Sequence, residues 1–299
     1  MNCLRSLAAL ALSAALLVAC SSGSGGPTMP LIAAPKVKPD TTGYKVLLRF
    51  PGSGKDGASP QAGLISVNGT FYGTTYRGGN NSCYDNLGCG IVFKLSTSGK
   101  ETVLYRFKGG SDGANPIAGL VSVKGVLYGA TQLGGASGDG TIFKVSLSGH
   151  ESVVYSFKGG TDGANPYASL IVVNGTLYGT TYYGGTGSRC GSSTCGTVFK
   201  ATTSGSESVL HSFKGGDDGA NPWGSLLFVS PTFYGTTSAD GPSADGTVFS
   251  MDKSGKERGR FILRGNTHGG VTDVAFRVSR CAFERNRFRN EFVQVAVAA

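Results

Sequence analysis

One motif returns four times along the chain, and this repetition limits the possible folds more than any other feature of the sequence. Each copy reads Tyr-Gly, then Thr or Ala, then Thr, at residues 72–75, 128–131, 178–181 and 234–237, so the copies start 56, 50 and 56 residues apart. A Gly-x-x-Phe motif follows each copy, and a further Phe precedes it. A unit of this size cannot bury its apolar face alone, so neighbouring copies are expected to stack.

The second copy shows the local structure that each unit predicts. Short apolar or alternating segments cover Gly119–Val123, Val126–Thr131, Thr141–Leu147 and Ser152–Phe157. Lys124-Gly125 separates the first two, and its sister copies have Asn-Gly, the residue pair most typical of a two-residue hairpin turn. Four antiparallel strands in about 50 residues match the size of a propeller blade. The expected fold is all-β, a β-propeller-like array of four-stranded antiparallel units.

The ends of the array bear on the number of blades. Tyr44–Phe50 has the pattern of a fourth strand with no unit before it, and Leu226–Met251 supplies only three strands. The N-terminal strand is therefore expected to complete the last unit and close a ring of about four blades, which removes exposed sheet edges. An open part of a larger ring, or a dimer that closes one, is the alternative. Antiparallel hairpins disfavour a β-solenoid.

Several motifs recur in fixed order: Leu-Tyr-Gly-Thr-Thr, Gly-Gly, Gly-Thr-Val-Phe and Ser-Phe-x-Gly-Gly-x-Asp-Gly-Ala-Asn-Pro. Together they resemble the GloVer (Gloeobacter/Verrucomicrobia-type) tandem repeat of exported bacterial proteins, over residues 44–257. The resemblance implies export, surface anchoring and a propeller-like architecture. It implies no activity, so no catalytic residue is carried over from the family.

The C-terminal segment, residues 258–299, departs from the repeat pattern. It is rich in Arg, and the Gly-Gly, Tyr-Gly and Asp-Gly-Ala-Asn-Pro motifs all stop together near Lys256. One hypothesis is a shifted reading frame, which would leave an atypical or disordered tail. The other is a genuine extension with a cationic face.

The N-terminus has the pattern of a bacterial lipoprotein signal. Arg5 precedes an apolar stretch, and Leu-Val-Ala-Cys ends at Cys20, which resembles a lipobox with Cys20 as the acylated residue. Residues 1–19 are then the signal peptide and residues 20–43 a lipidated, Gly/Ser-rich tether. Because Ser21 is not Asp, the resemblance to Gram-negative lipoproteins favours the outer membrane or cell surface. An ordinary signal peptide is the alternative.

The net charge of +9 does not indicate a nucleic-acid partner. Residues 41–251 have fourteen basic and twelve acidic residues, a net of +2, whereas residues 252–299 have ten and five, a net of +5. A nucleic-acid interface needs clustered Lys and Arg on the folded part of the chain.

The cysteines of the array fall into two close pairs. Cys83 with Cys89 and Cys190 with Cys195 lie in insertions that units one and three carry and unit two lacks. This pattern predicts two disulfides, each closing its own loop, in an oxidising compartment. Too few further ligands lie nearby for a zinc site.

Two sets of residues are candidates for binding. The Asp-Gly-Ala-Asn-Pro loops place oxygen ligands three residues apart and form a weak calcium candidate, although turn formation by the same residues is the simpler explanation; the residues are Asp112, Asn115, Asp162, Asn165, Asp218 and Asn221. Aromatic residues that vary between copies are the better ligand candidates, because binding loops vary while scaffolds repeat; they are Tyr76, Tyr84, Tyr167, Tyr182, Tyr183 and Trp223.

The favoured function is a surface-anchored module that binds a glycan or a cell-surface protein, with no required cofactor. Motifs of serine hydrolases, zinc proteases and phosphate loops do not occur. The alternative is a propeller-fold glycan hydrolase or lyase that uses paired carboxylates such as Asp217 and Asp218. A truncated array without function is a third possibility.

Overall fold

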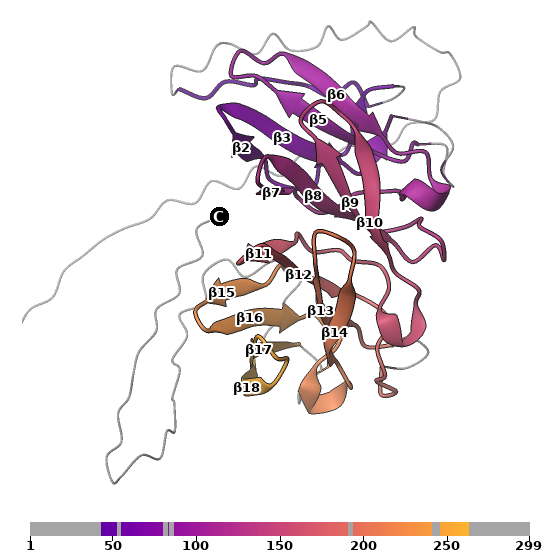
Figure 1. Ribbon diagram of the computed structural model, residues 1–299, viewed down its shortest axis with the longest axis vertical. Coiled ribbons are helices and arrows are strands. Elements are labelled where there is room, and N and C mark those ends of the chain that lie inside the picture. The colour runs from indigo at the N-terminus through magenta and orange to yellow at the C-terminus, as the bar shows by residue number, and fades with distance from the viewer. Residues whose placement is uncertain are drawn as a thin grey trace, which may run out of the picture. The chain divides into compact units, whose positions relative to one another are not determined.

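A computed structural model describes residues 43–262 except 53–54, 80–82, 84–86, 191–193 and 241–245 (Figure 1). The predicted signal peptide, Cys20 and most of the tether lie outside the described residues, as do Tyr84 and residues 263–299. None of the helices in the described ranges is long and apolar enough to cross a membrane.

The predicted all-β, propeller-like array is confirmed. The described residues form four four-stranded antiparallel sheets, and within each sheet the strands lie in chain order. The sheets comprise β2 (Ile65–Val67), β3 (Thr70–Thr75), β5 (Ile91–Leu95) and β6 (Glu101–Arg106); β7 (Val121–Val123), β8 (Val126–Thr131), β9 (Thr141–Ser146) and β10 (Glu151–Ser156); β11 (Ile171–Val173), β12 (Thr176–Thr181), β13 (Thr197–Ala201) and β14 (Glu207–Ser212); and β15 (Leu227–Val229), β16 (Thr232–Thr237), β17 (Thr247–Asp252) and β18 (Glu257–Ile262). A small pair, β1 (Gly57–Ala58) and β4 (Arg77–Gly78), adds to the first repeat.

The hairpin turns form where the sequence predicted them. Asn68-Gly69, Lys124-Gly125 and Asn174-Gly175 all have positive φ angles, between 51° and 79°. A turn with both central residues in this region has the twist that joins two antiparallel strands directly. The same local signal therefore sets the register of the first hairpin in three repeats.

A repeated aromatic pair joins each repeat to the next. The Phe after one fourth strand meets the Phe in the third strand of the following repeat edge-on: Phe107 with Phe143 at 5.0 Å and 71°, Phe157 with Phe199 at 5.1 Å and 67°, and Phe213 with Phe249 at 5.1 Å and 68°. Five of these six rings are completely or almost completely buried, and Phe249 is 3% exposed. Edge-to-face packing adds to the burial of apolar area, so these pairs lie at the centre of each interface.

Short 3-10 turns begin each linker between sheets, at η1 (Gly110–Asp112), η2 (Gly160–Asp162) and η3 (Gly216–Asp218). Both predicted disulfides are present, Cys83–Cys89 and Cys190–Cys195, with Cα atoms 5.3 and 5.4 Å apart. Cys89 and Cys195 are fully buried in the interfaces with the following repeats. Each disulfide therefore links an inserted loop to a cysteine that is buried between two repeats.

The last sheet is completed differently from the expected ring closure. Its fourth strand is β18, which pairs with β17, and residues 44–50 join none of the sheets. β18 also extends the repeat fold to Ile262, beyond the expected boundary at residue 257. The edge of β17 presents unpaired backbone N–H and C=O groups, and an extended segment without the repeat motif can pair with them.

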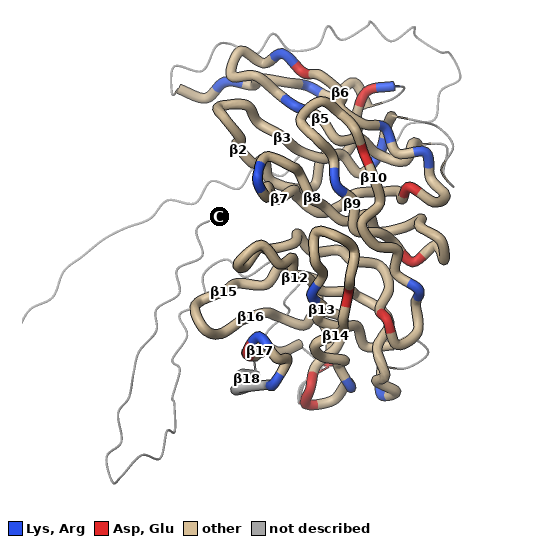
Figure 2. The backbone as a smooth tube through the Cα atoms, viewed as in Figure 1, with Lys and Arg blue, Asp and Glu red and all other residues tan. Residues whose placement is uncertain are grey.

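Charged residues of both signs are interspersed along the four sheets (Figure 2). This follows the near balance of acidic and basic residues over residues 41–251.

Candidate ligand-binding site

Two loops from neighbouring repeats meet at the same place in every repeat junction. One follows the second strand of a repeat and contains Tyr76, Gln132 or Tyr182; the other is the Asn-Pro linker that enters the next repeat. The linker Asn side chains donate Nδ2–H bonds to the loop carbonyl oxygens, from Asn115 to Tyr76, Asn165 to Gln132 and Asn221 to Tyr182, at 2.9–3.0 Å. The residue after each linker Pro is therefore held beside the preceding repeat's loop.

At the later junctions this arrangement gathers aromatic rings. The ring of Tyr167 stacks on that of Trp223, with centroids 4.5 Å apart and planes at 22°. Tyr182 meets both edge-on, at 5.0 and 5.5 Å, and Tyr183 meets Tyr182 at 4.6 Å. Trp223 is 47% exposed, so one large ring remains open to solvent on a supported base. We call these four residues the aromatic surface.

Polar groups border the aromatic surface. Gln132 donates an Nε2–H bond of 2.8 Å to the hydroxyl oxygen of Tyr167. Burial raises the pKa of Tyr167, and the neighbouring hydroxyls of Tyr183, Tyr76 and Tyr182 raise it further. The guanidinium carbon of Arg77 lies over the Tyr76 ring, 5.6 Å from its centroid. Of the six aromatic candidates, ring contacts join four, which are Tyr167, Tyr182, Tyr183 and Trp223, while Tyr84 lies outside the described residues.

The Asp and Asn of each Asp-Gly-Ala-Asn-Pro loop serve separate contacts. Asp112 accepts hydrogen bonds from the Tyr105 hydroxyl at 2.6 Å and the Lys108 amide at 3.1 Å, while Asn115 bonds to the preceding repeat. Asp162 and Asp218 have the same partners, with His211 in place of the tyrosine for Asp218. In the described part of the chain, no group of three or more His, Cys, Asp or Glu is placed to hold a metal ion. These contacts match the turn-forming explanation, and calcium binding stays a prediction.

A repeated pair of carboxyl groups was not predicted from the sequence. Burial and the nearby Asp112 carboxylate raise the pKa of Glu151 to about 7, and burial and Asp162 do the same for Glu207. Each Glu begins the fourth strand of one repeat and faces the Asp of the preceding linker. A Glu at a fixed place in each unit was a visible signal, but only the stacking of repeats shows which Asp it meets.

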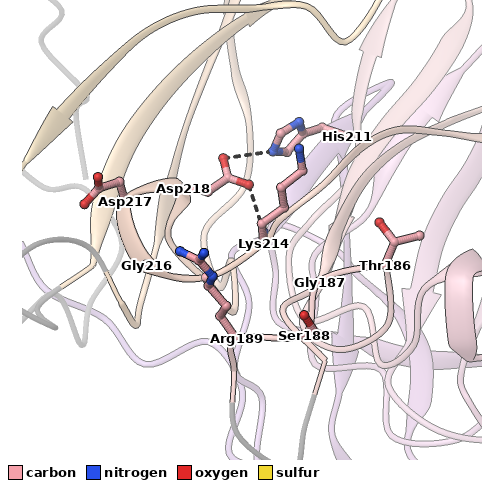
Figure 3. Close-up of a pocket in the computed structure, with 10 residues that line it drawn as sticks. Thr186, Gly187, Ser188, Arg189, His211, Lys214, Gly216, Asp217 and Asp218 are labelled. Carbon is pink, nitrogen blue, oxygen red and sulfur yellow. Dashed lines mark hydrogen bonds and ion pairs between the residues drawn. The ribbon is translucent and has the colours of Figure 1, made fainter.

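A cavity of about 570 Å³ lies between the third repeat and the last linker (Figure 3). Its lining includes Arg189, Lys214, Asp217, and the pair formed by His211 Nε2 and Asp218 Oδ1, 3.2 Å apart. Asp217 and Asp218 both line this cavity, although the Asp217 carboxylate points away from Asp218 (Figure 3). Asp218 already accepts bonds from His211 and the Lys214 amide, so it is held in position, while Asp217 is exposed.

Comparison with known proteins gives one sequence family and a set of distant folds. The profile of the Gloeobacter/Verrucomicrobia repeat matches residues 31–192. No curated protein matches the chain.

Solved structures that resemble the chain include a quinohemoprotein alcohol dehydrogenase from Pseudomonas putida HK5, with 14% identity, a TM-score of 0.44 and coverage of 67% of this chain and 34% of that one. A putative 6-phosphogluconolactonase from Bacteroides uniformis gives 14% identity, a TM-score of 0.44 and coverage of 69% and 57%. An α-L-arabinofuranosidase from Clostridium thermocellum gives 12% identity, a TM-score of 0.42 and coverage of 69% of this chain and 72% of that one. The chain spans about a third of the dehydrogenase and less than two thirds of the lactonase.

Proposed function

The chain belongs to the Gloeobacter/Verrucomicrobia repeat family, and on that premise we propose that it is a lipid-anchored binding module that holds a glycan against the aromatic surface. The observation that carries the proposal is the stack of Tyr167 and Trp223, with Trp223 47% exposed. The C–H faces of sugar rings pack on aromatic faces, which buries apolar area on both partners. A rigid aromatic ring contributes this area at little cost in conformational entropy.

The supporting contacts favour a preformed site. The Asn221 bond to the Tyr182 carbonyl and the Gln132 bond to the Tyr167 hydroxyl fix the rings before a ligand arrives. A site that is already ordered loses less entropy on binding. The Gln132 amide and the tyrosine hydroxyls are also suitable partners for sugar hydroxyls at the edge of the stacked rings.

The test uses Trp223, which is the single tryptophan of the chain and therefore reports on the site directly. The full chain is titrated with a panel of neutral oligosaccharides and polysaccharides while tryptophan emission and the melting temperature are recorded. We expect a saturable change in emission and a rise in melting temperature, since a ligand that binds only the folded state stabilises it.

Calorimetry with variants locates the ligand. Trp223→Ala and Tyr167→Ala are each expected to weaken binding at least about tenfold, which corresponds to 1.4 kcal/mol. Tyr44→Ala is the matched control, because Tyr44 is 72% exposed and lies outside the aromatic surface. Binding that survives both substitutions would place the ligand elsewhere, and a panel without any saturable ligand would reject a glycan function.

Anchoring is tested separately, at Cys20. The lipobox pattern predicts acylation there, and acyl chains hold a protein at a membrane through the burial of their methylene groups. In the native bacterium, the unchanged chain is expected in the outer-membrane fraction and to incorporate labelled fatty acid. Cys20→Ser should lose both properties. A Cys20→Ser chain that keeps the label would contradict lipidation at this residue.

The cavity in Figure 3 favours a second candidate function, a glycan hydrolase or lyase. Asp217 and Asp218 line the same cavity, and paired carboxylates supply the acid and the base or nucleophile of glycoside cleavage. The measurement is the release of reducing ends from the polysaccharides of the same panel. Turnover that Asp217→Asn abolishes, with the melting temperature unchanged, would support this function; saturable binding without turnover would support the binding module.

A further inference from the structure

The segment from Val46 to Phe50 lies against the first repeat in the way that the fourth strand of each repeat lies against the repeat that follows it. Phe50 meets Phe93 edge-on at 5.2 Å and 72°, the same geometry as the three Phe pairs between repeats. Gly99 lies so close to Leu47 that an added Cβ would come within 2.5 Å of the Leu47 carbonyl oxygen. Gly149 and Gly205 approach Leu104 and Val154 of the preceding repeats in the same way, at 2.7 and 2.6 Å.

In the second, third and fourth repeats, one face of the sheet packs against the preceding repeat; we call this the leading face. The leading face of the first repeat is less buried than the leading faces of the other three. Phe71 corresponds to Leu127, Leu177 and Phe233, which are all completely buried. Phe71 itself is only half-buried. Leu48 and Phe50 pack against the first repeat, yet Phe71 stays less buried than its three counterparts.

The opposite face of each sheet, which packs against the following repeat in the first three repeats, is the trailing face. In the last repeat the trailing face is more exposed than in the others. Tyr72, Tyr128 and Tyr178 are 5–6% exposed because the following repeat covers each of them, whereas Tyr234 is only half-buried. Val229, on the same sheet, is 38% exposed, while its counterpart Val173 is 7% exposed. At the internal junction before it, Tyr178 packs against Phe233 with ring centroids 4.6 Å apart.

We infer that two copies of this chain join head to tail, with Tyr234 of one copy packed on Phe71 of the next, as Tyr178 packs on Phe233. The leading face of the first repeat and the trailing face of the last repeat are both partly exposed in a single copy, so among the described residues these two faces do not cover each other. The interface continues a pattern that the array already uses three times. Such a contact between unlike faces either closes a ring or extends as a chain of molecules.

Association of two copies also changes the strand that pairs with β17. The segment Val46–Phe50 of the second copy arrives in the position of a fourth strand, which β18 fills in the isolated chain. It carries the repeat motif, with Leu47, Leu48 and Phe50 in place, whereas β18 lacks it. The segment from the second copy therefore pairs with β17 in place of β18. In the register of the internal sheets, where Lys144 faces Ser152 and Lys200 faces Ser208, Lys45 of that copy would face Ser250.

Site-directed cross-linking tests this register. Chains with Lys45→Cys and chains with Ser250→Cys, each in the otherwise native full-length protein, are mixed and joined with a short bis-maleimide, and peptide mapping identifies the link. We expect a link between residues 45 and 250 of different copies. Lys45→Cys mixed with Lys94→Cys is the matched control, because Lys94 has the same place in the first repeat but faces Thr102 of its own chain. It should give no such link.

Two further outcomes would overturn the inference. A chain with both Lys45→Cys and Ser250→Cys that links only within itself would mean that the array closes alone. The absence of any 45–250 link would mean that β18 keeps its place. Light scattering gives an independent measure: the mass should rise with concentration from one copy to two or more, and Phe71→Ala or Tyr234→Ala should raise the dissociation constant at least about tenfold. Val153→Ala, at an exposed apolar residue in the middle of the array, should leave it unchanged.

Discussion

The hydroxyl of Tyr105 donates a 2.6 Å hydrogen bond to Asp112, seven residues further along the chain, and the same bond joins Tyr155 to Asp162. The pair sits where one repeat ends and the linker to the next begins. Burial and the bond to Asp112 raise the pKa of Tyr105 well above its ordinary value, so the hydroxyl keeps its proton at all physiological pH values. The bond therefore holds the linker against the fourth strand of the repeat from which it starts, at every physiological pH.

Removal of this hydroxyl should destabilise the array. Tyr105→Phe leaves the ring packed on Phe107 but takes one partner from a carboxylate that is partly buried. A hydrogen bond to a charged group contributes about 1.5–3 kcal/mol, so we expect a loss of about 1–2 kcal/mol in the free energy of unfolding, measured with urea. Tyr44→Phe, at an exposed tyrosine, should change nothing; equal effects of both substitutions would contradict the role of the bond.

The carboxyl pairs predict that stability depends on pH. Glu151 and Glu207 have a pKa of about 7 in the folded chain against 4.5 when unfolded, so the folded state binds more protons between these values. Stability should therefore be greatest below about pH 5 as far as these groups are concerned, and fall as the pH rises through about 7. Asp112, Tyr105 and Lys108 face Glu151, and Asp162, Tyr155 and Lys158 face Glu207.

Glu151→Gln and Glu207→Gln isolate this effect, because an amide keeps the shape and cannot ionise. Melting temperatures measured from pH 5 to pH 8 should fall less steeply in each variant than in the native chain, and least in the double variant. Lys124→Gln, in an exposed hairpin turn, is the control for a change of one charge. An unchanged slope in the double variant would exclude proton sharing at the interfaces.

The two disulfides should each stabilise the chain by about 2 kcal/mol, since each closes a very short loop in the unfolded state. Cys83→Ala with Cys89→Ala, and Cys190→Ala with Cys195→Ala, are compared with the native chain by urea unfolding, with and without reductant. Reductant should lower the stability of the native chain and of each double variant, and have little effect on a chain that lacks both pairs. A native chain that resists reductant and both double substitutions would show that the loops are held by packing alone.

Tyr167 should control the environment of Trp223. With Tyr167→Ala the stacked support is removed, so tryptophan emission is expected to shift to longer wavelength and the near-ultraviolet circular dichroism of the aromatic surface to weaken. Gln132→Ala, which removes only the bond to the Tyr167 hydroxyl, should produce a smaller shift in the same direction. Far-ultraviolet spectra should remain unchanged in both variants, and a native-like emission of Tyr167→Ala would argue against the stack in solution.

Local signals in the sequence were sufficient for most of the fold. Asn68-Gly69 and Asn174-Gly175 predicted hairpins because Asn and Gly adopt the left-handed conformation more readily than other residues, and the spacing of Tyr-Gly predicted the number of sheets. The disulfide pairs followed from their position in matching insertions. The strand β18 could not be predicted from the sequence, because it carries no repeat motif and forms by backbone pairing with the edge of β17.

The candidate site was predictable as a set of residues but not as an arrangement. Variation between copies pointed to Tyr167, Tyr182 and Trp223, while their contact depends on the Asn–carbonyl bonds that align the loops of neighbouring repeats. The pairing of Glu151 with Asp112 also depends on how repeats stack. Contacts of this kind join residues from different repeats, and no periodicity within one repeat reveals them.

The bond from Asn165 to Gln132, like those from Asn115 and Asn221, ties each linker to the repeat just before it. Coupling of this nearest-neighbour form makes the array a one-dimensional lattice, in which the loss of one terminal unit weakens only the unit beside it. Amide hydrogen exchange should then be slowest in the second and third repeats and become faster toward both termini. Force applied to the N-terminal end of the array would then unfold the repeats one at a time.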